Sequence, residues 1–427
     1  MSAAWRVSEE KFLQDIDIIS ELKIRGSWGV TGNQSVSPYA SLSQILSGAN
    51  YPYDGGGATN IGFSIIRAAN PNLKWESTTQ TDIGFDLGLF DGRLTASVDY
   101  YVKTTKDLLL SRQLPTMTGF SSIVDNIGST ENKGIEIGLG GDPLVGALRW
   151  NTGFNISFNK SKVLKLADEN RLPFRTTTGA GYGITNSAPL MYLKAGEPFG
   201  QMTGRITLGT WSEAERDEAA VFGQLPGDIK YKDINGDGQI NNSDLTVIGN
   251  ALPDFIYGWS NRLSYKNFEL IVLIQGVYGN DLFNINRIRL ERPGEGTSAN
   301  LLNRWTPENQ NTDVPAFILQ SDRKAAALPS GRVSVGDSRV SRWVEDASYV
   351  RLKNITLAYL LPGSMISKLG MSKLRAYVTG TNLVTITDYT GYDPEISSFN
   401  SNDASLGIDF GSYPTSKTFT VGVDITF

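Results

Sequence analysis

The sequence predicts an all-β protein, an antiparallel transmembrane β-barrel with long extracellular loops. Three observations support this fold class. Segments of about ten residues alternate strictly between apolar and polar side chains, short and long connections alternate along the chain, and the chain ends on such a segment. The composition agrees, because 45 glycines and only 19% charged residues are typical of a β protein with many turns.

The first strands are predicted over residues 21–30 and 82–103. Residues 82–103 form one long hairpin in this interpretation, since two alternating runs flank Asp91-Gly92, the preferred two-residue hairpin turn. At roughly two strands per 60–70 residues we expect 12–14 strands in all. The remaining predicted strands lie in segments 133–141, 149–162, 256–279, 349–362, 373–384 and 418–427.

The connections between these strands differ in length in a regular way. Long structureless connections argue against a compact soluble domain, but an outer-membrane barrel has short periplasmic turns and long extracellular loops. A soluble sandwich or propeller also has alternating strands, so the asymmetry of the connections is what favours the barrel. The short joints are 90–93, 141–147, 265–268 and 360–373, and the long ones are 31–80, 104–131, 160–255, 279–347 and 384–417.

Each predicted strand has an apolar face for lipid and a polar face for a wet lumen. Aromatic residues near strand ends are expected to form a girdle at the membrane interface. The terminal strand, TFTVGVDITF, places Val423, Ile425 and Phe427 on its apolar face, and in a closed barrel it would pair with the first strand. The expected girdle residues are Trp28, Trp150, Tyr257, Trp259 and Tyr278.

The composition excludes several kinds of chemistry. With no Cys and no His, the chain can have no Ser-His-Asp triad, no Cys nucleophile and no Cys or His zinc site. The 39 basic and 44 acidic residues show no basic cluster, so we expect no nucleic-acid partner. No segment predicts a membrane-spanning helix, and MSAAWRVSEEKFLQD is not a signal peptide. We therefore expect either a cytosolic protein or a fragment whose true N-terminus lies upstream.

One segment has the spacing of a calcium-binding loop. DINGDGQINNSD, residues 233–244, offers oxygen ligands at alternate positions and places Gly238 where the loop turns sharply. Because Asp244 replaces the usual bidentate Glu, we expect a dissociation constant of about 10⁻⁴–10⁻³ M. The flanks are not EF-hand helices, so calcium would be a structural clip on the loop 227–250; an Asx-rich turn without metal is the alternative. The predicted ligands are Asp233, Asn235, Asp237, Gln239 through its carbonyl, Asn241 and Asp244.

Three other features have structural interpretations. The glycine-rich stretches 55–57 and 178–183 do not lie between a strand and a helix, so we expect flexible loops there and no phosphate site. SEAERDEAA, residues 212–220, predicts a short solvated helix. Loop aromatics could stack on a sugar, but we favour packing between loops; these are Trp305, Trp343, Tyr389 and Tyr392.

Five blocks in order along the chain resemble the SusC/RagA-like TonB-linked outer-membrane proteins of Bacteroidetes. The longest is GDIKYKDINGDGQINNSDLTVIGNALPDFIYGWSNRLSYKNFEL, residues 227–270; the others are 23–34, 70–110, 129–139 and 349–362. This resemblance implies the C-terminal part, residues 1–427, of a barrel of about 22 strands whose plug and N-terminal domains are absent from the chain. A terminal Phe427 resembles the signal that the bacterial barrel-assembly machinery reads.

The resemblance implies a function in the outer membrane. Such proteins are not enzymes; they import glycans or peptides, are driven by the TonB complex through the N-terminal part, and pair with a SusD-like surface lipoprotein. Outer-membrane lipid surrounds them. The substrate and its binding residues are not given by the sequence. The alternative is a secreted, calcium-stabilised β-protein that binds or cleaves polysaccharide, and it predicts apolar positions buried between sheets.

Overall fold

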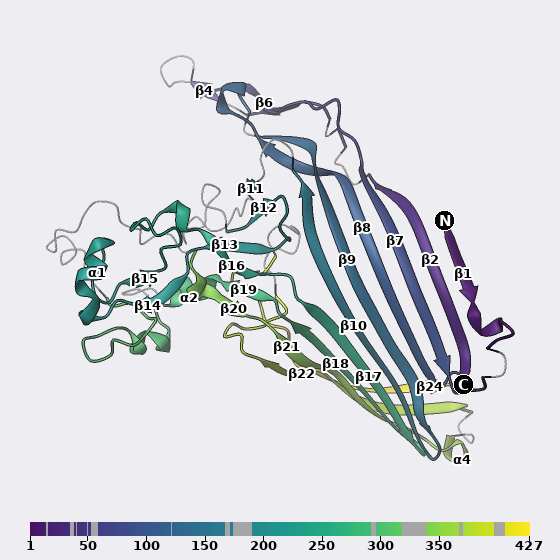
Figure 1. The fold of residues 1–427 in the computed structure, drawn as a ribbon. Coiled ribbons are helices and arrows are strands. Elements are labelled where there is room, and N and C mark those ends of the chain that lie inside the picture. Colours follow the sequence, from purple (N-terminus) through teal and green to yellow (C-terminus); the bar gives the residue numbers. More distant parts are fainter. Residues whose placement is uncertain are drawn as a thin grey trace.

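The computed structural model describes residues 1–13, 16–34, 38–39, 41–48, 50–52, 59–120, 122–166, 171–173, 190–291, 296–317, 339–366, 370–396 and 406–427. Its dominant element is one antiparallel sheet, long and strongly curved (Figure 1). Eleven strands form this sheet within the described residues, fewer than the 12–14 expected. In sheet order they are β1 (Ser2–Arg6), β2 (Ile19–Asn33), β7 (Glu76–Leu89), β8 (Leu94–Gln113), β9 (Ser122–Val145), β10 (Leu148–Lys165), β17 (Phe255–Tyr265), β18 (Phe268–Tyr278), β21 (Tyr349–Leu360), β22 (Lys373–Thr387) and β24 (Thr418–Thr426).

The predicted hairpin over 82–103 is confirmed. Leu89 of β7 pairs with Leu94 of β8, and the Arg93 N–H donates to the Phe90 carbonyl at 3.1 Å. Asp91 and Gly92 both have positive φ, 56° and 77°. Phe90 before them also has a positive φ, 57°, so the turn is a left-handed stretch of three residues, and Asp-Gly at its centre adopts positive φ readily. The local sequence thus sets the register of the whole hairpin.

One long connection was predicted wrongly. The segment 104–131 is mostly strand, because β8 and β9 continue as a paired ladder up to Gln113 and Ser122. Only residues 114–121 connect them, with a 3-10 turn, η2 (Thr116–Thr118). The paired part of β8 and β9 continues beyond the residues in which apolar and polar side chains alternate. Main-chain hydrogen bonds, and not an apolar face for lipid, therefore hold these strand ends together. The short joint predicted at 141–147 is likewise only Gly146 and Ala147.

The other long connections are not structureless, in contrast to the expectation. They carry short sheets that gather at the end of the main sheet opposite α4 (Gly363–Ile366) (Figure 1). The paired strands are β3 (Gln44–Ser47) with β6 (Phe63–Arg67), β4 (Tyr51–Pro52) with β5 (Thr59–Asn60), β11 (Arg171–Pro173) with β12 (Tyr192–Lys194), β13 (Gln201–Gly204) with β16 (Thr246–Asn250), β14 (Thr207–Thr210) with β15 (Ile229–Tyr231), and β19 (Asp281–Asn284) with β20 (Val344–Asp346) and β23 (Ile408–Asp409).

Three of these connections share one hydrophobic core. Buried side chains from the β10–β17, β18–β21 and β22–β24 connections pack together: Leu190, Met191, Met202, Phe283, Ile285 and Ile408. We call the described parts of residues 190–254, 279–348 and 388–417 the loop subdomain. Its helices are α1 (Arg216–Val221) and α2 (Ile285–Leu290), and its 3-10 turns are η4 (Glu213–Glu215), η5 (Asn242–Asp244), η6 (Ala299–Asn303) and η7 (Ser341–Trp343); η1 (Val7–Glu9) follows β1.

Both edges of the main sheet are open in the described residues. β24 pairs only with β22, and β1 pairs only with β2. The terminal strand is therefore held through its last paired residue, Thr426, but the pairing of last strand with first, which would close a barrel, is not present. β1 was missed from the sequence because five residues are too short for a periodic signal.

Candidate functional site

One face of the main sheet is apolar and exposed. The positions predicted to face lipid on β7, β8 and β9 include Ile83, Tyr100 and Leu139, all classed as exposed. On β24 the exposed fraction reaches 72% at Phe419 and 78% at Val421. A continuous apolar surface over eleven strands is far larger than a soluble protein leaves in water, and it is the surface that a transmembrane barrel turns to lipid.

The aromatic residues predicted as a girdle lie on this apolar face. Trp150, Tyr257 and Tyr278 lie within three residues of a strand end, whereas Trp28 and Trp259 lie further into their strands, in contrast to the expectation. Trp28, Trp259 and Tyr278 are exposed. The Trp150 Nε1–H donates to Asn261 Oδ1 at 3.0 Å, and the Trp259 Nε1–H donates to Thr152 Oγ1 at 3.0 Å. An indole whose ring is exposed and whose N–H is paired suits the boundary between lipid and headgroups.

Gly276 makes room for one of these aromatic side chains. It lies directly opposite Tyr257 in the ladder, and a Cβ at this position would lie 2.2 Å from the Tyr257 ring. The tyrosine therefore covers bare backbone of the neighbouring strand, which holds the ring against the sheet.

The opposite face carries charge. Arg25 of β2 lies in register with Gly84 of β7 and, one strand further, with Asp99 of β8. Its guanidinium binds Asp86 at 3.0 Å and Asp99 at 2.6 Å. Lys23 lies 3.7 Å from Asp86. Such pairs face the interior of a barrel, because an unsolvated lipid face would not tolerate them.

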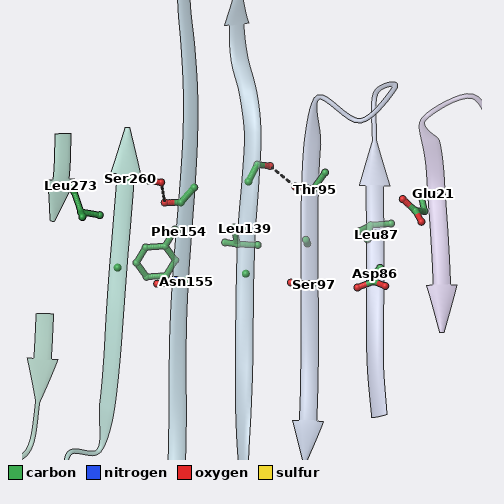
Figure 2. Close-up of a pocket in the computed structure, with 15 residues that line it drawn as sticks. Glu21, Asp86, Leu87, Thr95, Ser97, Leu139, Phe154, Asn155, Ser260 and Leu273 are labelled. Atoms are coloured by element: carbon green, nitrogen blue, oxygen red, sulfur yellow. Dashed lines mark hydrogen bonds between the residues drawn. The ribbon is translucent and has the colours of Figure 1, made fainter. Parts of the chain in front are cut away.

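A shallow depression of about 480 Å³ crosses this part of the sheet (Figure 2). Glycines of β9, β10 and β17 make its floor low, and short polar side chains such as Thr95 and Ser260 surround it. Both hydroxyls donate to carbonyls of the neighbouring strand, Gly140 and Gly153, at 3.2 Å. These two hydroxyls are therefore paired within the wall, whereas Glu21, Ser97 and Asn155 add further polar groups to the lining.

The segment predicted to bind calcium folds back on its own backbone. Asp233 accepts N–H bonds from Gly236 and Gly238, both at 2.8 Å. Asp244, fully buried, accepts from Ile234 at 2.9 Å and from Asn241 at 2.7 Å, which ties the end of the loop to its beginning. Gly236 and Gly238 both have φ of +75°, so the two sharp turns need glycine.

The middle of this loop is more open. Asp237 accepts the Gln239 N–H at 2.8 Å and the Asn235 side-chain amide at 2.9 Å, and these hydrogen bonds lower the pKa of Asp237. Asn241 caps η5 by accepting the Ser243 N–H at 2.7 Å. Among the described residues no three carboxylates are gathered closely enough to form a ready metal site. Each carboxylate oxygen has two lone pairs, so the N–H bonds leave room for a cation, and the donor set fits calcium chemically.

The surroundings of the loop agree with the rejection of an EF-hand. The strand β15 precedes it, the turn η5 forms its last three residues and the strand β16 follows it, so no helix pair flanks it. Arg205, which is buried, donates to the Asn241 carbonyl at 3.3 Å from Nε and 3.1 Å from Nη2. The loop is thus fastened to the loop subdomain and is not a free excursion.

The other residues considered from the sequence have structural roles. Trp305 and Tyr389 are buried and Trp343 packs on the shared core, as favoured, whereas Tyr392 is exposed. The predicted helix is α1 with its preceding turn η4, where Ser212 and Glu215 form a capping box. The glycine stretches 55–57 and 178–183 lie outside the described residues.

The terminal residues predicted as an assembly signal lie at an open edge. Val423 and Ile425 project from β24 on the exposed apolar face, and Phe427 follows the last paired residue. In the part of the chain that the structure describes, no helix is long and apolar enough to cross a membrane.

An exposed apolar face, a charged opposite face, short turns at one end and long folded loops at the other define part of a transmembrane β-barrel wall. The family model described as "TonB dependent receptor-like, beta-barrel" matches residues 23–383, and the chain belongs to this family. Barrels of this family are outer-membrane proteins, so the location and the family predicted from the sequence are confirmed.

Relatives support the assignment. The chain is 38% identical over 433 residues to TonB-dependent receptor P3 of Formosa agariphila, covering 99% of this chain and 41% of the relative. It is 28% identical to TonB-dependent receptor SusC of Bacteroides thetaiotaomicron, covering 100% of this chain and 40% of SusC. The chain therefore spans about two-fifths of the length of these curated relatives.

A solved structure has the same fold. The RagAB peptide transporter structure matches with a TM-score of 0.79 and 26% identity, covering 100% of this chain and 42% of that chain. The predicted fold class, part of an antiparallel transmembrane β-barrel, is confirmed.

Proposed function

We propose that this chain forms part of the barrel wall of an outer-membrane transporter that takes up a nutrient, either a glycan or a peptide. The observation that supports this most is the eleven-stranded sheet with one apolar, exposed face and one ion-paired face. A wall of this kind separates lipid from an aqueous interior. We assign no catalytic residue.

The energy source and the partners are part of the same proposal. The TonB complex would act through a part of the protein outside this chain, and a SusD-like surface lipoprotein would close over the loop end. Membership of the TonB-dependent receptor family supports the first partner. The likeness to SusC and to the RagAB transporter supports the second.

The test uses the full-length protein in its own cells. Uptake of a fluorescent peptide library and of fluorescent oligosaccharides is measured in cells with the gene, without it, and without a functional TonB. Uptake of one class that needs both the gene and TonB supports the proposal and selects the substrate. Equal uptake of both classes in all three strains would refute it.

The alternative, a secreted calcium-stabilised β-protein, makes a structural prediction that is wrong here. It requires the apolar strand positions to be buried between sheets. In the described residues these positions are exposed on a single sheet, and nothing packs over them.

We propose in addition that the loop 227–250 binds calcium as a structural clip. The ligands would be side-chain oxygens of Asp233, Asn235, Asp237, Asn241 and Asp244, with the carbonyl of Gln239. The spacing, the two left-handed glycines and the carboxylate-lined turn support this proposal. When bound, calcium would neutralise three carboxylates that otherwise rely on backbone N–H groups, which would stabilise the loop against opening.

We propose finally that Phe427, Ile425 and Val423 form the assembly signal read by the barrel-assembly machinery. Their position on an edge strand supports this, because an unpaired strand edge is a template for another strand. The outer-membrane lipid would then cover the exposed apolar face of the assembled barrel.

A further inference from the structure

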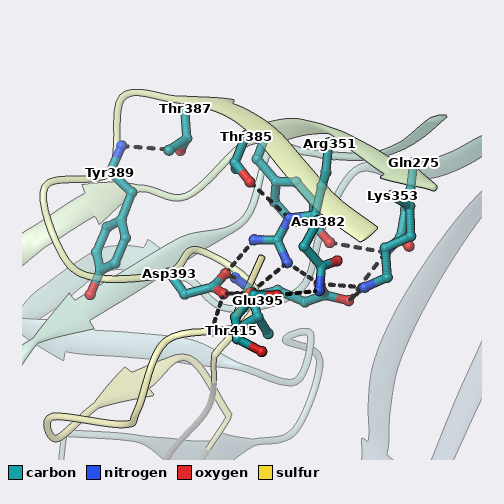
Figure 3. Close-up of polar contacts among 12 residues, drawn as sticks. Gln275, Arg351, Lys353, Asn382, Thr385, Thr387, Tyr389, Asp393, Glu395 and Thr415 are labelled. Atoms are coloured by element: carbon teal, nitrogen blue, oxygen red, sulfur yellow. Dashed lines mark hydrogen bonds and ion pairs between the residues drawn. The ribbon is translucent and has the colours of Figure 1, made fainter. Parts of the chain in front are cut away.

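A single buried arginine joins both ends of the β22–β24 loop to the barrel wall. Arg351 of β21 is 1% exposed. The structure describes residues 388–396 and 406–417 of this loop. The partners of Arg351 lie near the start of the loop at Asp393 and Glu395, and near its end at Thr415 (Figure 3).

The hydrogen bonds of Arg351 use every nitrogen of the guanidinium. Nη2 donates to Asp393 Oδ1 at 2.5 Å, Nη1 donates to Glu395 Oε2 at 2.6 Å and to Thr415 Oγ1 at 3.2 Å, and Nε donates to Thr385 Oγ1 at 2.9 Å. Asp393 in turn accepts the Thr415 N–H at 3.1 Å and its hydroxyl. The two ends of the loop are therefore bound to the wall and to each other.

This attachment lies on the interior face of the wall. Arg351 pairs in register with Gln275 of β18 and with Thr385 of β22, so the three side chains share one face. Its neighbour in sequence, Val350, is exposed on the other, lipid-facing side. Because Asp393 and Glu395 cover Arg351, the loop lies across the interior face of the barrel.

Residues of β18 and β21 donate further hydrogen bonds to the carboxylate of Glu395. Gln275 donates to Glu395 Oε1 at 3.3 Å, and Lys353 donates to Glu395 Oε2 at 3.0 Å. Glu395 is thus held by β18 and by two residues of β21. Moving the start of the loop away from the wall therefore requires breaking hydrogen bonds to both strands at once.

The described remainder of the loop has a second, independent attachment. β23 pairs in parallel with β19 of the loop subdomain, and Ile408 is buried in the shared core. The Tyr389 hydroxyl donates to Asp409 Oδ2 at 2.6 Å, and both residues are buried. The loop is therefore anchored at its two ends and at an intermediate strand.

Loops that open during function have few buried contacts and many solvated hydrogen bonds. The β22–β24 loop has the opposite character, because a desolvated guanidinium–carboxylate pair cannot separate without leaving a buried charge unpaired. We propose that the described parts of this loop, residues 388–396 and 406–417, form a fixed strap across the interior face of the barrel, that Arg351 is the residue positioning it, and that any opening of the passage occurs elsewhere. The existence of a passage rests on the proposed transport function, whereas the immobility of the strap does not.

The experiment measures distances between spin labels in the full-length protein in lipid nanodiscs. The chain contains no cysteine, so introduced cysteines are unique once any outside this chain are replaced. One label is placed on the strap at Tyr413→Cys, where the side chain is 92% exposed, and the other on the wall at Leu357→Cys. A second pair, Ile83→Cys with Leu357→Cys, reports the wall alone.

In the parent we expect a single narrow distribution of strap–wall distances. In Arg351→Gln the width of this distribution should increase at least twofold, while the distribution of wall–wall distances stays unchanged. Arg375→Gln is the matched control, since Arg375 also pairs with two carboxylates, Asp424 and Glu269, but does not touch the strap. A broad or two-peaked distance in the parent would overturn the proposal, whether or not Arg351→Gln assembles. An unchanged narrow distance distribution in Arg351→Gln would show that Arg351 does not position the strap. The distance measurement does not require transport. A negative uptake assay would therefore refute the proposed function without refuting the fixed strap.

Discussion

Glu291 is the residue of the loop subdomain whose loss should have the largest local effect. Its side chain is 4% exposed and lies between two guanidinium groups. Arg287 binds it at 2.7 Å, and Arg342, also 4% exposed, binds it at 2.5 Å. Burial raises the pKa of Glu291, but the Arg287 hydrogen bond and the charges of Arg342 and Arg287 outweigh burial, so the pKa lies below its ordinary value.

The substitution Glu291→Gln keeps the shape and removes the charge. Each arginine keeps one other carboxylate, Glu345 for Arg287 at 2.9 Å and Asp313 for Arg342 at 3.1 Å. Because these remaining partners compensate in part, the loss should lie at the lower end of the range for breaking a buried pair, about 3 kcal/mol. At about 1.4 kcal/mol per tenfold change, local opening becomes about 150-fold more frequent.

Hydrogen exchange on the full-length protein in lipid measures this opening. Amides of α2 and η6 should exchange about 150-fold faster in Glu291→Gln, and those of β8 and β9 should not change. Glu197→Gln is the control, since Glu197 pairs with Lys194 at 3.4 Å while 39% exposed and should contribute under about 1 kcal/mol. If Glu291→Gln accelerated exchange no more than Glu197→Gln, the argument from burial would be refuted.

Four further outcomes are expected. Asp233→Ala with Asp237→Ala should abolish calcium binding measured by calorimetry and leave the barrel assembled, while the exposed pair Asp217→Ala with Glu218→Ala should not; equal titrations for both would contradict the site. Deleting Phe427 from the full-length protein should lower its surface level in a whole-cell antibody assay, and an unchanged level would count against an assembly signal. The Lys230 hydrogen bond, with those of Ser212, lowers the pKa of Glu215 to about 2, so a carboxyl NMR titration should have its midpoint there and Lys230→Met should raise it; a midpoint near the ordinary value of about 4.3 would be the contrary result. Because the pKa of Glu291 is lowered, its stabilisation is complete above about pH 4.3 and is lost as the pH falls through the folded value. The rate of pepsin cleavage of α2 in the parent, divided by the rate in Glu291→Gln at the same pH, should therefore rise from about pH 5 to about pH 2, and an unchanged ratio would argue otherwise.

Local patterns in the sequence account for most strands of the barrel wall. Alternation of apolar and polar residues, the Asp91-Gly92 turn and the terminal apolar strand all depend on near neighbours, and each is present as expected. A period of two assigns faces directly, because successive side chains of a strand point to opposite sides. The spacing of residues 233–244 is also local, which is why the sharp turn at Gly238 could be anticipated.

Tertiary structure alone determined how the loops are organised. The extension of β8 and β9 through residues expected as a long connection depends on pairing between chain segments, and polar sequence gives no periodic signal for it. The shared core joins three connections that are far apart in sequence. Arg351 finds partners 42 and 64 residues away, and nothing near it in sequence indicates them. Contacts of this range form only when the barrel brings the strand ends together, so the strap could not be predicted from the sequence.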